Sequence, residues 1–332
     1  MQTQVNIGIN GFGRIGKRLF RLLHDHPTIK VVAINDKAPG DILAHLLAYD
    51  SIHGPFSAKV SYCSGTLTVA DKDIRLTHHH NLESMDWTGI DIVVEATGRY
   101  KTKQDLQKHI DAGAKRVILS APPIHDDIKT IVMGVNESLL TEHDLIISNA
   151  SCTTNNAAPM LKVVHELCGV TQASISTVHS FTSDQNLHDQ PHLDFRRARA
   201  ATASIIPTTT GAAKALTKVF PDLAGAIGGC GIRVPVANGS LTDMTLNVTR
   251  AIDRVALNKA FETAAQGPLK GILEYSEQPL VSVDIIGNPH SCIFDAEMTS
   301  VIGHMIKIIG WYDNETGYSS RIIDLINYLS SK

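Results

Sequence analysis

The sequence has little net charge, no long apolar run and few aromatic residues. Its 332 residues include 30 Lys and Arg against 33 Asp and Glu, a formal net charge of −3. No overall basic field therefore exists to hold nucleic acid or an anionic membrane. No apolar stretch approaches the roughly 18 residues that a membrane-spanning helix needs. The first residues show no basic segment followed by an apolar run, so we expect no secretory signal.

Cysteine is scarce and scattered along the chain. Five cysteines occur, an odd number, and none belongs to a Cys-x-x-Cys pair, so neither a zinc site nor a disulfide framework is indicated. Free thiols without an export signal point to a reducing compartment, which predicts a cytoplasmic protein. One of these thiols is then a candidate for chemistry rather than packing. The five are Cys63, Cys152, Cys168, Cys230 and Cys292.

The chain is long enough for two domains, and its two halves differ in pattern. In the first 150 residues, continuous apolar runs alternate with helical stripes, and such runs suit the strands of a parallel sheet buried on both faces. The first half therefore predicts a doubly wound α/β domain. We expect strands at residues 5–10, 31–36, 90–96 and 116–120, and helices at 14–24 and 104–112.

From about residue 170, apolar and polar residues alternate instead, as in antiparallel strands with one solvated face. Segments 173–179, 241–248 and 305–312 show this alternation. A polar, arginine-rich stretch at about 180–203 predicts a long loop, and loops of that length in compact domains are usually functional. A last helix is expected at about 317–330.

Gly11, Gly13 and Gly16 form a Gly-x-Gly-x-x-Gly motif between the first strand and the first helix. Gly11 allows the tight turn, Gly13 lets the backbone approach a pyrophosphate, and Gly16 lets helix and strand pack closely. Asp36 ends the second strand, where a carboxylate accepts hydrogen bonds from ribose hydroxyls. The pattern predicts a dinucleotide site, and a structural glycine turn is the alternative.

The segment SNASCTTNN places Cys152 at or near a helix start, between a strand-like run and an apolar-periodic stretch. There the helix dipole and free N–H groups favour a thiolate. The polar neighbours argue against an apolar pocket, although an isolated cysteine is more often a small buried residue. A thiol nucleophile needs a base. His179, which closes a strand before the long loop, is the candidate, and a satisfied strand-end histidine is the alternative.

Other polar groups give weaker signals. The three histidines at 78–80 could hold a metal but lack a helical context, so a solvated loop is favoured, and the histidines of 188–192 are interpreted in the same way. Arginine forks suit phosphate, so residues 196–199 and Arg233, with the Thr–Gly turn at 208–211, are candidates for binding an anionic substrate. For the arginines, structural ion pairs or subunit contacts are the alternative.

Longer segments match a known family. They are INGFGRIGKR, the acid in AIND, EATGRY, ISNASCTTN, STVHSFTSDQ, RRARAATASIIPTTTGAAKA, IRVPVANGS, GILEYSEQPLVS and WYDNETGYSSRI. On these segments the chain resembles phosphorylating glyceraldehyde-3-phosphate dehydrogenases over essentially its whole length. ASCTTN followed by TVHS is highly specific to that family and its nearest relatives.

The resemblance implies a Rossmann-type NAD-binding domain at 1–150, joined by the C-terminal helix 317–332, and an α+β catalytic domain at 151–316 with a mostly antiparallel sheet. It implies a homotetramer whose long loop lies at a subunit interface. The implied reaction oxidises glyceraldehyde 3-phosphate with NAD and inorganic phosphate, through a thioester, to 1,3-bisphosphoglycerate. No metal, nucleic-acid or membrane partner is expected.

The resemblance also gives roles to single residues. Cys152 would be the nucleophile and His179 its base, while Thr182 and Arg233 would hold the C3 phosphate of the substrate. The second anion and neighbouring substrate groups would contact Ser151, Thr153, Arg197, Thr210 and Gly211. The cofactor would contact Gly11, Gly13, Arg14, Ile15, Gly16, Asp36, Thr97, Ser120 and Asn314, the last of which would orient the nicotinamide amide.

Some positions depart from the common family pattern. Asn156 stands where many members have a second cysteine, His80 where members usually have arginine near the adenine, and Gln190 where NAD-dependent members commonly have leucine. Lys37, beside Asp36, could meet a 2′-phosphate, so we expect a preference for NAD with weak NADP use. Two other functions stay open. One is erythrose-4-phosphate dehydrogenase, which typically departs from the Thr-Thr-Thr-Gly segment seen here, and the other is a non-catalytic NAD-binding module.

Overall fold

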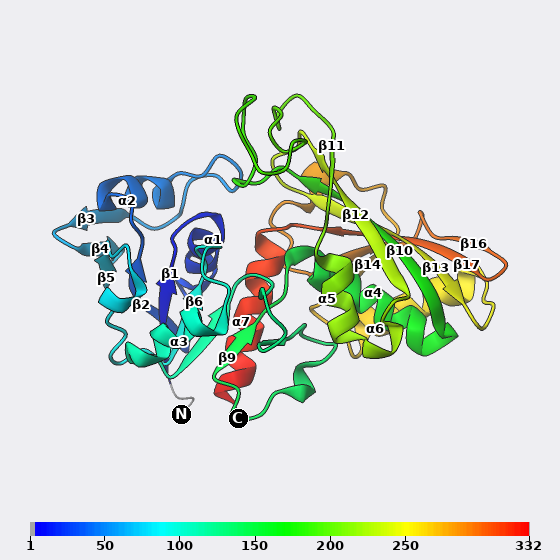
Figure 1. The fold of residues 1–332 in the computed structure, drawn as a ribbon, viewed down its shortest axis with the longest axis horizontal. Helices are drawn as coiled ribbons and strands as arrows, with labels where there is room; N and C mark the ends of the chain where they lie inside the picture. Colours follow the sequence, from blue (N-terminus) through cyan, green and yellow to red (C-terminus); the bar gives the residue numbers. More distant parts are fainter. Residues whose placement is uncertain (1–3, 332) are drawn as a thin grey trace. The chain divides into compact units, whose positions relative to one another are not determined.

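The computed structural model of the chain describes residues 4–331, which divide into two compact units. The first unit contains the residues up to Ile131, then Ser138–Ala150 and the residues from Ser319 onward. The second contains Val132–Glu137 and Ser151–Tyr318. The chain thus enters the second unit briefly at Val132–Glu137 and again at Ser151, directly before Cys152. It leaves the unit within the last helix, α7 (Thr316–Ser330) (Figure 1).

The first unit is built on a nine-stranded sheet of order β3-β4-β5-β2-β1-β6-β7-β9-β8. From β5 to β8 in this order all neighbours are parallel, so the predicted parallel sheet is confirmed. At the other edge, β3, β4 and β5 form an antiparallel meander that the sequence pattern did not predict. The strands are β1 (Val5–Asn10), β2 (Ile29–Asn35), β3 (Val60–Cys63), β4 (Thr66–Val69), β5 (Lys72–Thr77), β6 (Ile92–Glu95), β7 (Arg116–Leu119), β8 (Lys129–Thr130) and β9 (Ile146–Ser148).

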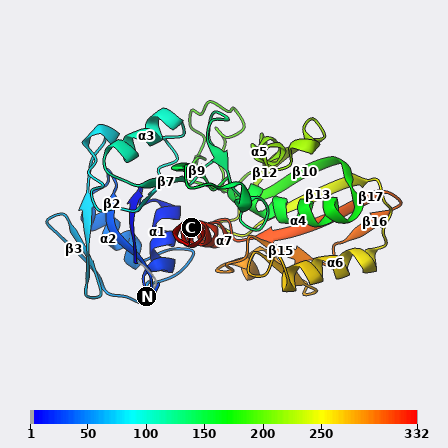
Figure 2. The same cartoon turned by 90° about the horizontal axis from the view of Figure 1, so that it is seen from below.

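Helices cover both faces of this sheet because of the way its strands are connected. The chain passes from β1 through α1 (Arg14–Leu23) to β2 on one side, and from β6 through α3 (Lys103–Asp111) to β7 on the other. Right-handed crossovers in opposite directions place α1 and α3 on opposite faces, as Figure 2 shows. A third helix, α2 (Gly40–Ala48), packs against β3. The direction of winding reverses between β1 and β6, and ligands of such sheets bind at the carboxyl ends of the strands there.

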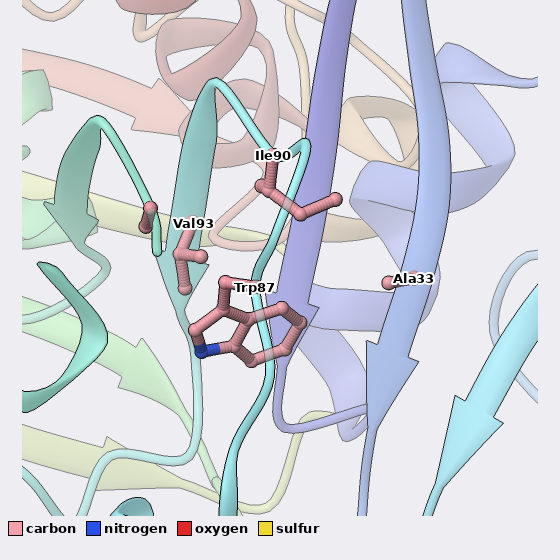
Figure 3. Close-up of a cluster of buried hydrophobic side chains, with 5 residues drawn as sticks. Ala33, Trp87, Ile90 and Val93 are labelled. Atoms are coloured by element: carbon pink, nitrogen blue, oxygen red, sulfur yellow. The ribbon is translucent and has the colours of Figure 1, made fainter. Parts of the chain in front are cut away.

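One face of the sheet is closed by a buried cluster around Trp87 (Figure 3). The indole packs with Ala33 of β2 and Val93 of β6. It also lies over Gly8, where a Cβ atom would come within 2.8 Å of the ring, so this position of β1 requires glycine. The indole N–H donates to Nδ1 of the buried His109 on α3 at 2.9 Å. Trp87 therefore joins α3 to the sheet both by apolar burial and by a hydrogen bond.

The second unit is built on a mixed sheet of order β11-β12-β10-β13-β17-β15-β14, with β16 paired to β17. β10 runs parallel to β12 and β14 parallel to β15, while the other pairs are antiparallel, so the mostly antiparallel sheet is confirmed. The strands are β10 (Val170–Ser180), β11 (Ile206–Thr208), β12 (Ile227–Val234), β13 (Ser240–Val248), β14 (Leu273–Ser276), β15 (Cys292–Asp295), β16 (Ser300–Ile302) and β17 (Met305–Tyr312).

The helices of the second unit pack together on its sheet. α4 (Cys152–Cys168) contacts β10, β13, β15 and β17, and α5 (Ala212–Val219) and α6 (Arg254–Gln266) pack beside it (Figure 2). Every residue from Thr153 to Leu161 on α4 is buried, so this helix forms the centre of the core. Between β10 and β11 the chain forms turns without a helix or strand, as expected for the long loop.

Candidate active site

The glycine-rich turn after β1 has a conformation that requires glycine. Gly11 has a φ of +95°, and a Cβ atom there would lie 2.6 Å from the backbone nitrogen of Thr97. A Cβ atom on Gly16 would lie 2.2 Å from the carbonyl oxygen of Gly11, so Gly16 lets α1 close against the turn. Around Gly13, directly before α1, the space is open to 4 Å. The turn therefore leaves room for a phosphate beside a helix N-terminus.

Asp36 follows β2 and lies beside this turn. Its Oδ2 accepts the N–H of Phe12 at 2.7 Å, and its Oδ1 accepts the N–H of Ala38 at 2.9 Å. A carboxylate offers about four lone-pair sites, so Asp36 can still accept hydrogen bonds from ribose hydroxyls. It borders a cavity of about 220 Å³ that Gly11 and Gly13 also line, at the carboxyl ends of β1, β2 and β6. The residues present therefore suit the adenosine end of a dinucleotide.

A buried polar network fixes the wall of this cavity that β6 provides. Glu95, the last residue of β6, accepts the amide of Asn10 at 2.6 Å, the backbone N–H of Thr97 at 2.8 Å and the Thr97 hydroxyl. Because Nδ1 of His109 accepts the Trp87 indole N–H, the imidazole proton lies on Nε2, which donates to Glu95 at 3.1 Å. Glu95 thereby holds Thr97, one of the predicted cofactor residues, at the edge of the cavity.

Three other predicted cofactor residues lie at the same edge of the sheet. Ser120 follows β7, and its buried hydroxyl has no hydrogen-bond partner among residues 4–331. Ile15 is the second residue of α1, and Arg14 is the first. The Arg14 guanidinium makes a bidentate ion pair with Asp50, at 2.6 and 3.2 Å. The side chain of Arg14 therefore anchors the loop that carries Asp50.

Cys152 is the first residue of α4, and its side chain is partly exposed. Ser151 caps the helix, because its hydroxyl accepts the N–H of Thr154 at 3.1 Å. Ala150, one residue earlier, has a φ of +56°, which is unfavourable for a residue with a side chain. The Sγ atom of Cys152 lies 3.4 Å from Nε2 of His179. The structure thus brings together the thiol and the imidazole that the sequence singled out.

Strand pairing brings Arg233 beside His179. β10 and β12 are parallel, and these two residues are partners in register, so their side chains lie on the same face. Nδ1 of His179 lies 2.7 Å from the carbonyl oxygen of Ser180, and Nη1 of Arg233 lies 3.0 Å from the same oxygen. Because a carbonyl only accepts, we assign the imidazole proton to Nδ1, so that the Ser180 carbonyl accepts from both Nδ1 and Nη1 of Arg233. Nε2 is left as an acceptor that faces the thiol.

Burial and the Arg233 cation set the charges of this pair. Burial raises the pKa of the Cys152 thiol, while Arg233 and the donors of Thr153 act in the opposite direction. Burial, followed by the Arg233 cation, lowers the pKa of His179 to about 3. Both shifts favour a neutral thiol beside a neutral imidazole, whereas the helix start alone predicted a thiolate. Nε2 is then able to accept the thiol proton at the moment the sulfur attacks.

Tyr312 had no predicted role, yet its buried hydroxyl joins α4 to the sheet. It lies 3.0 Å from the hydroxyl of Thr153 and 3.0 Å from that of Thr177. The ring meets the imidazole of His179 edge to face, with centroids 5.9 Å apart. Tyr312 thus supports both partners of the thiol–imidazole pair. Sequence analysis named Tyr312 only as part of the segment WYDNETGYSSRI. Nothing local in that segment reveals contacts to residues as distant in the chain as Thr153 and Thr177.

Asn314, the predicted nicotinamide contact, is held in one orientation within the second unit. Its Oδ1 accepts the hydroxyl of Ser180 at 2.8 Å and that of Ser240 at 2.9 Å. The neighbouring Asp313 carboxylate accepts the N–H of Thr316 at the start of α7, at 2.8 Å, and so fixes the turn. With Oδ1 occupied by two donors, the amide NH₂ of Asn314 is the end that can donate to a ligand.

Arg197, in the long loop, already has acidic partners. Its Nη1 lies 2.5 Å from a carboxylate oxygen of Asp184, and its Nε lies 3.5 Å from one of Asp194. The Nε also donates to the hydroxyl of Thr208 at 3.0 Å. This arrangement is the structural ion pair that the sequence left open as an alternative for the arginines. An anion at this position has to compete with Asp184 for the guanidinium.

The remaining predicted substrate residues lie at the ends of elements in the second unit. Thr182 follows the end of β10, two residues after Ser180. Thr210 and Gly211 stand directly before α5, and the Thr210 hydroxyl accepts the N–H of Ala212 at 3.2 Å. Ser151 and Thr153 flank Cys152 at the start of α4.

Other histidines and cysteines have structural surroundings. Nδ1 of His78 lies 2.8 Å from the carbonyl oxygen of Asp36, and its Nε2 lies 3.3 Å from the hydroxyl of Tyr62.

Across the described part of the chain, no three or more His, Cys, Asp or Glu side chains gather as ligands for a metal ion. None of its helices combines the length and the apolar character needed to cross a bilayer. The other four thiols form no disulfide. Cys168 and Cys292 are buried, and Cys63 and Cys230 are exposed.

Comparison with known families covers both units. The family described as "Glyceraldehyde 3-phosphate dehydrogenase, NAD binding domain" matches residues 5–103, and "Glyceraldehyde 3-phosphate dehydrogenase, C-terminal domain" matches residues 151–314. The chain belongs to the glyceraldehyde-3-phosphate dehydrogenase family. It is 50% identical over 332 residues to the enzyme of that name from Geobacillus stearothermophilus, and 49% over 333 residues to glyceraldehyde-3-phosphate dehydrogenase 1 from Bacillus subtilis (strain 168). Both alignments cover 99% of this chain and 99% of the relative.

Asn156, one of the positions that we noted as departing from the family pattern, has a packing role. Asn156 is fully buried on α4. Its amide nitrogen lies 3.2 to 3.3 Å from the carbonyl oxygens of Ser291, Gly310 and Trp311. Its amide N–H groups therefore tie the first turns of α4 to β17.

Proposed function

We propose that the chain oxidises glyceraldehyde 3-phosphate to 1,3-bisphosphoglycerate, with NAD and inorganic phosphate, through a thioester on Cys152. One observation carries the proposal: the Cys152 thiol, at a helix start, lies 3.4 Å from Nε2 of His179, and His179 pairs in register with Arg233. A non-catalytic binding module has no use for a nucleophile, a base and an arginine in this arrangement. Membership of the family and its NAD-binding domain supports the choice of cofactor.

In the first step, Sγ of Cys152 bonds to the aldehyde carbon while the thiol proton passes to Nε2 of His179. The imidazolium returns that proton to the former carbonyl oxygen, which gives a hemithioacetal. The backbone N–H of Cys152, at the start of α4, would stabilise negative charge that develops on this oxygen. Bound NAD supplies the acceptor for the hydride of the same carbon.

In the second half of the reaction, Nε2 of His179 takes the hydroxyl proton as the hydride leaves, so that a thioester remains on Cys152. An oxygen of inorganic phosphate then attacks the thioester carbonyl, and the carbon–sulfur bond breaks. The sulfur recovers its proton from His179, and the acyl phosphate leaves. The thioester keeps the free energy of oxidation that a free carboxylate would lose.

The two phosphate groups need two sets of donors. We assign the C3 phosphate of the substrate to Arg233 and Thr182. Arg233 is half-buried and lies next to the reacting pair, and a guanidinium binds phosphate bidentately. We assign the inorganic phosphate to the second set, which also contacts neighbouring substrate groups. That set consists of Ser151, Thr153, Arg197, Thr210 and Gly211.

For the cofactor, we assign the ribose hydroxyls to Asp36 and the phosphates to the glycine turn and the start of α1. Thr97 and Ser120 line the neighbouring strand ends, and the Ser120 hydroxyl is available for a ligand because it has no partner in the described structure. Asn314 would donate its NH₂ to the nicotinamide carboxamide. The carboxamide oxygen is the matching acceptor.

A steady-state assay tests this function. NADH formation is followed with glyceraldehyde 3-phosphate, with and without inorganic phosphate, and with erythrose 4-phosphate as the comparison substrate. We expect turnover with glyceraldehyde 3-phosphate that depends on phosphate and disappears in Cys152→Ser, whose alcohol is far too weak an acid to act in the same way. Faster turnover of erythrose 4-phosphate, or full activity of the variant, would refute the proposal.

We also propose a homotetramer in the cytoplasm. The long loop exposes three large apolar side chains, Leu187, Leu193 and Phe195, to 62%, 102% and 89%. Large apolar side chains exposed together on one loop are typical of an interface. Light scattering on a sizing column should give a mass near four times 35.9 kDa, and a monomer would contradict the proposal.

For the location in the cell, the unpaired cysteines support a reducing compartment, and cell fractionation is the check.

A further inference from the structure

The first unit contains a buried carboxylate and a buried imidazole that take no part in the proposed reaction. Glu95 ends β6 and His109 lies on α3, and each exposes at most 1% of its surface. Within the described part of the chain, the lining of the cavity beside Asp36 includes Asn10 and Thr97 but neither Glu95 nor His109. A buried charge is costly unless it is paired and hydrogen-bonded, so the surroundings of Glu95 require an explanation.

On one side of Glu95, hydrogen bonds run from the backbone of His79 through two asparagines. Oδ1 of Asn35 accepts the N–H of His79 at 2.8 Å, and Nδ2 of Asn35 donates to the carbonyl of His79 at 3.1 Å. A backbone N–H only donates and a carbonyl only accepts, so these two groups fix the amide of Asn35. The same Nδ2 donates to Oδ1 of Asn10 at 2.9 Å, which leaves Nδ2 of Asn10 to donate to Glu95 at 2.6 Å.

On the other side, the hydrogen bonds start at the indole N–H of Trp87, which can only donate (Figure 3). It donates to Nδ1 of His109 at 2.9 Å, so Nε2 of His109 carries the proton and donates to Glu95 at 3.1 Å. A third branch is Thr97, whose backbone N–H donates to Glu95 at 2.8 Å and whose hydroxyl donates to the same oxygen. All three branches direct their protons toward Glu95, as a carboxylate requires.

Thr97 connects this network to the wall of the cavity. Its hydroxyl accepts the N–H of Arg99 at 3.1 Å while it donates to Glu95, and so holds the turn at Gly98, where φ is +69°. Its backbone nitrogen lies against the glycine-rich turn, because a Cβ atom on Gly11 would come within 2.6 Å of it. A shift of Thr97 would therefore disturb both the wall of the cavity and the turn beside it.

We propose that Glu95 is a positioning residue for NAD, and that it acts through the direction of these hydrogen bonds without touching the cofactor. The proposal rests on the cofactor function proposed above for the cavity, and it adds a residue outside the lining. A carboxylate has about four lone-pair sites, and the four donors from Asn10, His109 and Thr97 fill them. Glu95 thereby holds Asn10 and Thr97 in the orientations in which they line the cavity.

An amide at position 95 could not satisfy the same partners. Glutamine has one side-chain oxygen, and its NH₂ group only donates. In place of Oε1, the NH₂ group would face the backbone N–H of Thr97, and in place of Oε2 it would face donors of Asn10 and His109. Both orientations bring donors together in a buried site, where an unpaired donor is costly. The variant relieves this only by turning Thr97 or Asn10 away from its place.

The test is calorimetric titration of the full-length protein and its variants with NAD, together with kcat, KM for NAD and a urea titration of each. Glu95→Gln should weaken NAD binding and raise KM for NAD by about tenfold or more, because binding has to restore the displaced donors. A loss of binding that is equal in the ground state and the transition state raises KM alone, so kcat at saturating NAD should stay within about twofold.

Trp87→Phe is the matched control. It removes the outermost donor and part of a buried apolar cluster, and so should lower the free energy of unfolding, yet it leaves the four donors to Glu95 in place. Its NAD affinity should stay within about twofold of the wild type, because the groups that line the cavity keep their partners.

The double variant, Glu95→Gln with Trp87→Phe, tests the direction of the hydrogen bonds. Without the indole N–H, His109 can carry its proton on Nδ1 and accept the new NH₂ group with Nε2. The double variant should therefore bind NAD at least about twofold better than Glu95→Gln, although it is less stable. A purely structural role predicts a further loss of binding instead.

Unchanged NAD binding in Glu95→Gln, equal weakening in Trp87→Phe, or weaker binding in the double variant than in Glu95→Gln would overturn the proposal. If Glu95→Gln does not fold, Glu95→Asp replaces it under the same criteria, because a carboxylate one methylene shorter cannot reach all four donors. A wild-type protein that binds no NAD would instead refute the cofactor function of the cavity.

Discussion

Replacing His179 by asparagine removes the base that faces Cys152 but keeps a side chain that can still form hydrogen bonds. In the variant the thiol proton has no acceptor, and a thiolate forms without a neighbouring positive charge. At the observed Sγ–Nε2 distance of 3.4 Å, the attraction between thiolate and imidazolium is at most about 5 kcal/mol, taking an effective dielectric constant of about 20. That limit agrees with the loss of roughly 10²–10⁴ in rate expected when a general base is removed. We therefore expect the acylation rate to fall by this factor.

The assay is single-turnover formation of NADH after mixing enzyme and NAD with glyceraldehyde 3-phosphate, because it separates acylation from product release. His165→Asn is the matched control. His165 also lies on α4, near its far end, where it pairs with the exposed Asp222 at 2.8 Å, so its replacement should change the rate less than about twofold. A His179→Asn variant that keeps more than about a tenth of the wild-type rate would show that His179 is not the base. An equal loss in both variants would point to general damage to α4.

Three further predictions concern stability and cofactor binding. The pKa of His179 is about 3 in the folded chain, against 6.5 for an unperturbed histidine. The unfolded chain therefore binds the proton first, and the free energy of unfolding should fall by about 1.4 kcal/mol per pH unit as the pH drops below 6.5. Urea titrations at pH 7 and pH 5.5 should show a larger loss in the wild type than in His179→Asn, which keeps the smaller contributions of His24 and His26, whose pKa values burial also lowers. Gly16→Ala should abolish measurable NAD binding or destabilise the fold, because its Cβ would lie 2.2 Å from a backbone oxygen, and wild-type affinity and stability would contradict the account of the turn. Tyr312→Phe should lower the free energy of unfolding by about 1–3 kcal/mol, because it removes two buried hydrogen bonds to the Thr153 and Thr177 hydroxyls, and an unchanged urea midpoint would show that the hydroxyl is not needed.

The sequence predicted those parts of the fold that depend on long local patterns. The buried strand at 5–10 and the alternating strand at 305–312 appear where they were expected, as β1 and β17. The meander at 60–77 was not predicted, because its three strands are only four to six residues long and have exposed positions that resemble a loop. Helices α5 and α6 were also missed.

Contacts between distant segments explain what the sequence could not show at the site. Cys152 and His179 could be singled out, because each lies at the end of an element with a recognisable pattern. Arg233 was only one of several candidate arginines, and its place beside His179 depends on the parallel pairing of β10 with β12, whereas the alternating pattern suggested antiparallel strands. The neutral charge state of the pair likewise depends on burial, which the polar neighbours of Cys152 in the sequence conceal.

The most direct test of the central claim is mass spectrometry of the protein quenched after reaction with glyceraldehyde 3-phosphate and NAD in the absence of inorganic phosphate. We predict a 3-phosphoglyceryl group on the peptide that contains Cys152, formed together with NADH, and its disappearance when inorganic phosphate is added before the quench. NADH formation without this adduct, or an adduct on another of the five cysteines, would contradict a mechanism through a Cys152 thioester.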